Sequence, residues 1–129
     1  MIVFFSNRLN HHQAPVSDAL YCLTKGQFRF VETDAPSEQS KKGSQEDFSS
    51  RPYLIKAWHN RECAEIAKTL SLTADVAIFG ANSIFYEVLR CRNTDGCTFD
   101  VSERWLKKGI INMLSPRFIR AQWYYYTLF

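Results

Sequence analysis

The sequence predicts a three-layer α/β domain built on a mostly parallel, five-stranded sheet. The chain opens on Ile2–Ser6, a β-branched and aromatic run that is typical of a strand buried on both faces. Helical and strand-like patterns then alternate along the chain, as they do in a parallel sheet with crossover helices. With 129 residues, of which 46% are hydrophobic, the chain is long enough for one domain with its own core.

The first three predicted elements form a β-α-β unit. After the strand Ile2–Ser6, Pro15 suits the first turn of a helix, and Gly26 is suited to end that helix. Phe28–Val31 is the second predicted strand. Between Pro15 and Gly26 the apolar residues recur at helical spacing and predict the apolar face of the helix: Val16, Ala19, Leu20 and Leu23.

A polar stretch, Thr33–Pro52, separates the second strand from the third. Phe48 is its only large apolar residue, and serines and mixed charges fill most of the rest. Loops of this length are uncommon inside compact domains and tend to be mobile or functional. We predict a mobile loop over residues 33–52, and the alternative is a loop that orders over a ligand or a partner.

The alternation continues in the next part of the chain. Tyr53–Trp58 is the third predicted strand, and Asn60 can cap the helix that follows it. Asp75–Phe79 is the fourth strand and ends at Gly80, which permits a sharp turn and brings backbone amides close to the strand end. The apolar stripe of the helix between these strands is Cys63, Ile66, Ala67 and Leu70.

The last predicted elements are one helix, one strand and two helical stretches. Asn82 or Ser83 caps a helix that ends near Arg92, and Asn93–Gly96 forms a turn. The fifth strand is Cys97–Val101. The two final helical stretches are Glu103–Leu114 and Pro116–Tyr126.

Two groups of polar residues follow predicted strands. In open α/β sheets, ligands bind at the carboxyl ends of the strands. His11 and His12 follow the first strand, where a neutral imidazole can take a proton from a hydroxyl or donate one hydrogen bond while accepting another. Alternatively, one imidazole caps the following helix and the other is solvated. Ser102, Glu103 and Arg104 follow the fifth strand, where Arg104 can hold a carboxylate or phosphate or can pair with an acidic neighbour.

Several common enzyme motifs are missing from the sequence. It has no GxGxxG after the first strand and no GxxxxGK[ST], which disfavours a nicotinamide dehydrogenase and a P-loop enzyme. GxSxG and HExxH are also missing, which disfavours the simplest hydrolases. The four cysteines lack CxxC spacing and a histidine at zinc-site distance. We therefore expect structural thiols, with Cys22 and Cys63 on apolar helix faces.

The net charge of +3 is concentrated in the C-terminal quarter. Residues 102–129 hold five positive residues against Glu103 alone, so this segment carries +4. Its basic and aromatic side chains suit contact with anionic lipid, packing on the sheet, or contact with a further domain. Nucleic-acid binding is disfavoured because no recognition motif accompanies the charge. The apolar end Trp123–Phe129 leads us to expect that the chain is the front part of a longer protein.

The sequence also bears on the compartment. It contains no apolar run of 18 residues, and its N-terminus lacks the basic region and the length of a signal peptide. We expect a cytoplasmic protein, with peripheral contact between the basic segment and the inner membrane face as a possible addition.

Five segments of the chain resemble a known enzyme family. They are FFSNRLNHHQAPVSDALY, RFVETD, RPYLIKAW, ADVAIFGA and TFDVSERWLKKGIINMLSPR, and they occur here in this order. Together they resemble the N-terminal half of bacterial GT-B glycosyltransferases of the kind grouped with glycosyltransferase family 4. The resemblance covers nearly the whole chain apart from residues 34–50.

The resemblance implies a Rossmann-like domain that binds the acceptor, facing a second domain that binds a nucleotide sugar. Such enzymes move the sugar to a hydroxyl of a glycan or a lipid-linked acceptor, often for the bacterial cell envelope, and need no metal or other cofactor. The missing donor domain would be the main partner, and this domain alone would be inactive. On this view His11 and His12 are the catalytic candidates. The acceptor or phosphate contacts would come from Asn7, Asn10, Gln13, Gly80, Asn82, Ser102, Glu103 and Arg104.

A second hypothesis belongs to a different class. The chain would then be a non-catalytic α/β interaction module that docks to a membrane or a partner through its basic and aromatic end. A phosphate-accepting receiver is disfavoured within this class, because Asn7 and Gly80 stand where a receiver needs acidic residues.

Overall fold

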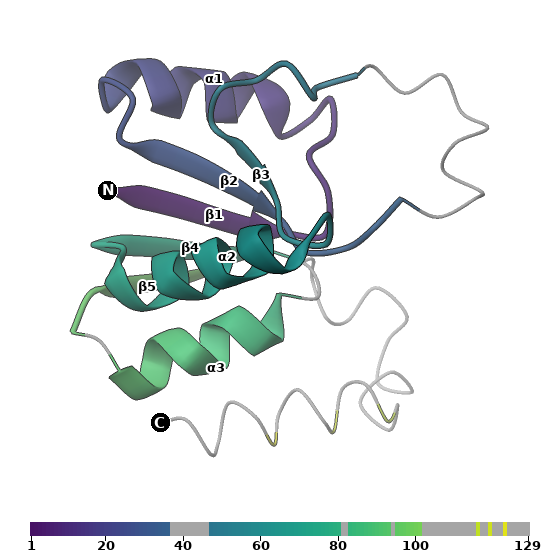
Figure 1. Cartoon of the computed structure of the whole chain (residues 1–129). Helices are drawn as coiled ribbons and strands as arrows, with labels where there is room; N and C mark the ends of the chain where they lie inside the picture. Colours follow the sequence, from purple (N-terminus) through teal and green to yellow (C-terminus); the bar gives the residue numbers. More distant parts are fainter. Residues whose placement is uncertain are drawn as a thin grey trace, which may run out of the picture.

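The computed structural model describes residues 1–36, 47–80, 83–93 and 95–101, together with Pro116, Ile119 and Trp123. In this part of the chain five strands form one sheet that carries three helices (Figure 1). The strands are β1 (Ile2–Ser6), β2 (Phe28–Glu32), β3 (Leu54–Lys56), β4 (Val76–Gly80) and β5 (Cys97–Val101). The helices are α1 (Ala14–Leu23), α2 (Arg61–Thr73) and α3 (Ile84–Asn93).

The sheet is parallel throughout, and its strand order is β3-β2-β1-β4-β5. The chain lays strands outward from β1 to β3, then crosses back and continues on the other side of β1 with β4 and β5. This order defines a Rossmann-like α/β domain and confirms the predicted fold class. The order reverses between β1 and β4, so the carboxyl ends of these two strands mark the switch point of the sheet.

The sheet has a hydrophobic cluster on each face, because successive side chains of a strand point to opposite sides. The face that carries α1 is the α1 face, and its cluster is Phe4, Leu9, Ala14, Phe28, Phe30 and Tyr53. The opposite face carries α2 and α3 (Figure 1). Its cluster is Val3, Phe5, Val31, Ala57, Ala67, Ala74, Ala77 and Phe79.

Phe5 lies at the centre of the α2–α3 face and is completely buried. Its ring centroid lies 5.0 Å from that of Phe79 on β4 and 5.1 Å from that of Tyr86 on α3, and both pairs are stacked. Aromatic pairs of this kind add about 0.5–1.5 kcal/mol each beyond the area they bury. The three rings therefore join β1, β4 and α3 in one packing unit.

A buried arginine fixes the amino ends of β4 and β5. The Arg90 side chain is 1% exposed, and its guanidinium donates to the carbonyl oxygens of Ala74, Asp75 and Cys97. A Cβ added to Gly96 would lie 1.6 Å from Nη2 of Arg90, so only glycine leaves room for the guanidinium. The carbonyl groups bound by Arg90 keep hydrogen-bond partners in a place that excludes water.

Helix α1 turns a different side to the sheet from the one that its sequence predicts. The sheet-facing residues are Ala14 and Ser17, both buried, whereas Val16 is 55% and Leu23 is 79% exposed. Small residues at positions 14 and 17 let the helix approach the strands closely, so the wider Val16–Ala19–Leu23 stripe is turned away. The predicted apolar face of this helix is therefore wrong except at Leu20, which packs against the core.

The other predicted elements are present with small shifts of their ends. The third strand is shorter than predicted, because only Leu54–Lys56 pair with β2. Asn60 caps α2 as predicted, with Oδ1 accepting the Cys63 amide at 2.7 Å. Ile66 is exposed rather than buried, and Ala67 and Ser71 face the sheet instead. Cys22 is exposed, so it does not lie on the buried helix face.

Three predictions fall wholly or partly outside the described residues. The predicted mobile loop is described at residues 33–36 and 47–52, and residues 37–46 lie outside. The predicted helix 103–114 lies outside as well. Of the predicted helix 116–126, Pro116, Ile119 and Trp123 are described, and all three are helical.

Candidate functional site

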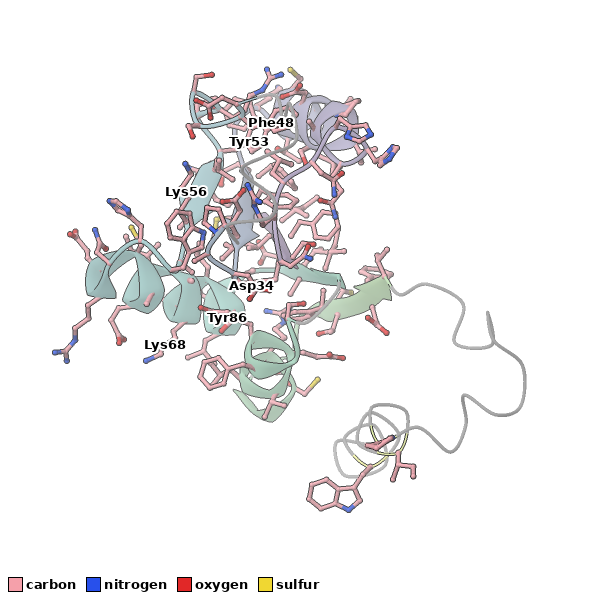
Figure 2. All side chains as sticks on the ribbon, turned by 90° about the vertical axis from the view of Figure 1, so that its right-hand side faces the viewer. Asp34, Phe48, Tyr53, Lys56, Lys68 and Tyr86 are labelled. Carbon is pink, nitrogen blue, oxygen red and sulfur yellow. The ribbon has the colours of Figure 1, made fainter. Side chains whose placement is uncertain are left out.

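The carboxyl edge of the sheet gathers most of the residues that the sequence singles out. Figure 2 looks onto this edge, because the strands in Figure 1 point toward the side that faces the viewer there. Asp34, which follows β2, lies near the middle of that view, with Lys56 of β3 on one side and Tyr86 of α3 on the other. The loop that joins β1 to α1 starts at the switch point of the sheet.

Asn10 organises the β1–α1 loop. Its Oδ1 accepts the amides of His12 at 3.0 Å and of Gln13 at 3.1 Å. Its backbone carbonyl accepts the amide of Ala14 at 2.9 Å, which starts the helix. An asparagine that accepts the amides two and three residues ahead is a common way to begin a helical turn. The side-chain oxygen and the backbone carbonyl of Asn10 therefore both accept hydrogen bonds within the loop. The sequence predicts a ligand contact for this residue.

Glu32 ties the same loop to β2. Its side chain is 6% exposed, and Oε1 accepts the amide of Leu9 at 3.1 Å across 23 residues of sequence. Its backbone carbonyl accepts the amide of Ala57 at 2.9 Å. In dinucleotide-binding Rossmann domains an acidic residue near this strand end binds the ribose hydroxyls. Here the carboxylate supports the loop by accepting the Leu9 amide.

Gln13 is the candidate residue with the least satisfied side chain. Its Nε2 donates to the Ser6 hydroxyl at 3.2 Å, while its buried Oε1 has no hydrogen-bond partner. Turning the amide over would only place the nitrogen in the position that lacks a partner. Asn7 lies beside them, and its Oδ1 accepts the Ser6 hydroxyl at 3.3 Å and the Arg8 amide at 2.8 Å. A buried amide oxygen without a partner at this edge is suited to accept a hydrogen bond from a ligand hydroxyl.

The two candidate histidines stand together on the outside of the loop. Both are exposed, and their ring centroids lie 3.8 Å apart with the planes tilted by 45°. Asn10 holds the backbone amide of His12, so the hydrogen bond that begins the turn uses main-chain atoms and not an imidazole. The alternative that an imidazole caps α1 finds no support at the helix start, where Gln13 is the capping residue without a side-chain hydrogen bond.

Gly80 closes β4 opposite Ser6 on the other side of the switch point. A Cβ at Gly80 would lie 3.0 Å from the Phe4 ring and 3.6 Å from the Ser6 hydroxyl. Its φ is not positive, since Gly26 is the glycine with positive φ among the described residues. The predicted sharp turn stays a prediction, because residues 81 and 82 lie outside the described residues. The absence of a side chain at Gly80 makes room for Phe4. The remaining predicted site residues, Asn82, Ser102, Glu103 and Arg104, lie outside the described residues.

The end of β3 brings three further side chains to this edge that the sequence does not single out. Lys56 Nζ lies 5.9 Å from the centre of the Trp58 ring and donates to the Ser49 hydroxyl at 2.6 Å. His59 meets the same ring edge-on, with the centroids 6.1 Å apart. The buried Nε1 of Trp58 has no hydrogen-bond partner. The sequence holds a signal for His59, which directly follows the third predicted strand, but none for Trp58, which the sequence places inside that strand.

Glu87 is the titratable group with the largest resolved shift among the acidic residues. It lies one turn into α3 and is 7% exposed. Burial, and then the charge of Asp100 on β5, raise the pKa of its carboxyl to about 7. Shifts of this size often accompany functional groups, but buried structural acids show them too. The sequence gives no sign of this raised pKa, because the burial of a position on α3 depends on the tertiary fold.

Two searches of the described residues give negative results. Within residues 1–36, 47–80, 83–93 and 95–101, no group of three or more His, Cys, Asp or Glu side chains could hold a metal ion. In the same part of the chain no helix has the length and apolarity to cross a membrane.

The fold and this edge define a Rossmann-like α/β domain with an ordered polar loop at its switch point. No protein-family model, no curated protein and no solved structure matches the chain.

Proposed function

We propose that the chain is the acceptor-side domain of a GT-B glycosyltransferase, which moves a sugar from a nucleotide sugar to a hydroxyl group. The order of the five sequence segments that resemble glycosyltransferase family 4 supports this proposal, and the Rossmann-like sheet is compatible with it. The observation that carries it is the β1–α1 loop. Asn10 and Glu32 fix its backbone, and it presents two exposed imidazoles beside the unsatisfied Gln13 amide.

The proposed chemistry assigns a role to each side chain of the loop. The acceptor oxygen forms a bond to the anomeric carbon, and the bond from that carbon to the phosphate oxygen breaks. The nucleoside diphosphate leaves with the bonding electrons, and the proton of the acceptor hydroxyl passes to His11 or His12. A positioned base of this type contributes about 10²–10⁴-fold to a rate. Gln13 and Asn7 would orient the acceptor hydroxyls, and Trp58 would offer an apolar ring to a sugar face.

The proposal depends on a donor-binding domain in the same protein. Sequencing the reading frame past Phe129 tests this directly. A further stretch of roughly 100–200 residues with an α/β pattern would support the proposal. A stop codon directly after Phe129 would contradict it, because no place for the nucleotide sugar would remain.

The role of the loop is tested in the protein that the reading frame encodes. Release of nucleoside diphosphate from UDP- and GDP-sugars is measured with glycan and lipid-linked acceptors for His11→Ala, His12→Ala and Gln13→Leu. We expect at least one histidine variant to lose roughly 10²-fold or more in kcat. Gln27→Ala is the control, since Gln27 is exposed at the opposite edge of the sheet. Unchanged rates in both histidine variants would contradict the proposed role.

The exposed apolar stripe of α1 favours a second function. Val16 and Leu23 are more than half exposed and lie on one side of the helix. A non-catalytic docking module would use such a stripe together with the basic C-terminal quarter to bind a membrane surface. Flotation with vesicles that contain anionic lipid tests the docking function. Recovery that falls with Leu23→Ser would support docking, and no recovery in the wild type would exclude it for this chain.

A further inference from the structure

The first residues after β2 stay bound to the end of β1. The amide of Thr33 donates to the carbonyl of Ser6 at 2.9 Å, and the amide of Asp34 donates to the carbonyl of Asn7 at 3.2 Å. The contact between the two segments thus continues past the last strand pair, Ser6 and Glu32. Asp34 and Asn7 are therefore neighbours at the carboxyl edge of the sheet, beside its switch point, and a backbone hydrogen bond holds them together.

The carboxylate of Asp34 keeps most of its capacity to accept hydrogen bonds. Asp34 is exposed and lies near the middle of the carboxyl edge in Figure 2. Within the described residues its carboxylate accepts one hydrogen bond, from the Thr33 hydroxyl at 3.4 Å. That hydroxyl has a single hydrogen and lies closer to the Ser6 carbonyl, at 3.2 Å. The two carboxylate oxygens of Asp34 are therefore available to a ligand.

Glu32 stands at the strand end where dinucleotide-binding Rossmann domains carry the acidic residue that binds ribose hydroxyls. Its carboxylate is not available for this role, because Glu32 is 6% exposed and Oε1 accepts the Leu9 amide at 3.1 Å. Asp34 follows two residues later at the same strand end and exposes its carboxylate. The acidic group that can bind hydroxyls at the end of β2 is therefore that of Asp34.

Asn7 supplies hydrogen-bond donors next to this acceptor. Its Oδ1 accepts the Ser6 hydroxyl at 3.3 Å and the Arg8 amide at 2.8 Å. The Arg8 amide can only donate, so the bond fixes which end of the Asn7 side chain is the oxygen. Nδ2 then carries two hydrogens, and the described part of the chain offers neither of them an acceptor. A donor and an acceptor with free capacity thus stand on neighbouring residues.

These free groups select one class of ligand. A hydroxyl group both donates and accepts, so it can satisfy the Asp34 carboxylate and the Asn7 amide together. Two hydroxyls on the same side of a ring can donate to the two oxygens of one carboxylate. A phosphate or carboxylate ligand offers mainly acceptors, and the like charge of Asp34 disfavours it. The buried Gln13 Oε1 without a partner is a further acceptor at this edge and has the same preference for hydroxyl donors.

We propose that Asp34 and Asn7 form a diol site, which binds two hydroxyls on neighbouring carbons and on the same side of a sugar ring. Hydrogen bonds to a carboxylate are stronger than those between neutral groups, so Asp34 contributes most of the selectivity. The ring can be a pyranose or the ribose of a nucleoside. This inference goes beyond the proposed function, which does not use Asp34, and it does not depend on sugar transfer.

NMR titration of the ¹⁵N-labelled 129-residue chain tests the site. Methyl α-D-mannopyranoside supplies a pyranose cis-diol and uridine supplies a ribose cis-diol. Methyl 2-deoxy-α-D-glucopyranoside and 2′-deoxyuridine are the matched compounds that lack one of the two hydroxyls. We expect the Asp34 amide and the Asn7 Nδ2 signals to shift with at least one cis-diol. Its deoxy analogue should bind roughly tenfold more weakly, since a hydrogen bond to a charged group is lost.

Two variants remove the proposed contacts with little change in shape. Asp34→Asn removes the charge, and Asn7→Asp removes the Nδ2 donors but keeps an oxygen for Ser6 and Arg8. Each should weaken binding of the diol roughly tenfold or more. Asp95→Asn is the control and should bind as the wild type does, because Asp95 is exposed before β5 at the opposite edge of the sheet. Well-dispersed spectra show that each variant is folded.

The outcomes separate the site from its alternatives. A response to uridine but not to the mannoside would support a diol site for a ribose, and the reverse would support one for a pyranose. Unchanged binding in Asp34→Asn would overturn the proposal, and so would equal binding of the cis-diols and their deoxy analogues. A wild type that responds to neither cis-diol would overturn it as well. The samples contain no nucleotide sugar, so failure of the proposed sugar transfer leaves these results unaffected.

Discussion

The hydroxyl of Tyr53 donates a 2.7 Å hydrogen bond to the carboxylate of Asp18. The bond joins the segment before β3 to α1 across 35 residues. Arg51 adds an ion pair to the other oxygen of Asp18 at 3.1 Å. Tyr53 is 1% exposed, and burial followed by the Asp18 carboxylate raises the pKa of its phenol. The end of the long polar loop is thus anchored to the first helix.

We expect Tyr53→Phe to lower the free energy of unfolding by about 1–2 kcal/mol, because the Asp18 carboxylate loses its buried donor. Arg51→Ala should cost less than about 1 kcal/mol, since that ion pair is partly exposed. Urea unfolding of Tyr53→Phe, Asp18→Ala and the double variant measures the coupling between the two groups. Additive losses in the double variant would contradict the anchoring role of the bond.

Arg90→Ala is expected to destabilise the domain by about 3 kcal/mol or more, because buried carbonyl groups lose their donors and a cavity remains. Gly96→Ala should have an effect of similar size, since its Cβ would take the place of the guanidinium. The control is Ala64→Ser on α2. Gly26→Ala is not used as a control, because Gly26 has a positive φ and an alanine there would be strained. Thermal unfolding checks the series. A loss below about 1 kcal/mol for both Arg90→Ala and Gly96→Ala would show that the arginine is dispensable.

Glu87 makes stability depend on pH. The carboxyl has an ordinary pKa in the unfolded chain and a pKa of about 7 in the folded one, so the folded state holds the proton more tightly. Stability is therefore full below the unfolded pKa and falls as the pH rises toward 7, by up to about 3 kcal/mol. Glu87→Gln should remove this decline and stabilise the domain above pH 7. The control is Glu62→Gln, because Glu62 is exposed.

Denaturant melts at pH 4.5, 6 and 8 give the three stabilities for each protein. A wild type whose slope over this range equals that of Glu87→Gln would contradict the assignment. The alternative source of a slope is Asp100, so Asp100→Asn is measured beside it and should reduce the slope only in part.

Glu32 is expected to hold the β1–α1 loop. Glu32→Ala removes the acceptor of the Leu9 amide, whereas Glu32→Gln keeps an oxygen at that place. We expect the Leu9 amide to exchange its hydrogen roughly tenfold faster in Glu32→Ala, since a net hydrogen bond of about 1.5 kcal/mol is lost. Exchange at Ala57, whose amide binds the backbone carbonyl of the same residue, should change little. Equal protection of Leu9 in both variants would show that the carboxylate is not the support.

The sequence predicts the alternation of elements because that alternation is local. Strand residues such as those of Ile2–Ser6 and Cys97–Val101 are continuous runs, and their predicted ends agree with the structure. The Asn60 cap is likewise a local hydrogen bond between neighbouring residues. The position of His11 and His12 at the carboxyl edge of the sheet follows from the same local order.

The orientation of the helices could not be predicted in this way. The side of α1 that meets the sheet depends on how closely Phe4 and Phe30 allow it to approach, and those residues lie elsewhere in the sequence. The same holds for Gly80, whose role is to leave room for Phe4. Glu32 and Glu87 are ordinary acidic residues in the sequence, and only the tertiary fold buries them.

The stacked rings of Phe5, Phe79 and Tyr86 imply an order of events during synthesis. Local contacts form early, and contacts between distant residues form late because the intervening chain must first close into a loop. When β1, α1 and β2 have emerged from the ribosome, Phe5 has neither of its stacking partners, which follow more than 70 residues later. One face of the nascent sheet therefore exposes apolar side chains until β4 and α3 have been synthesised. Exposed apolar surface of this kind promotes aggregation, so the risk of aggregation is greatest during that interval.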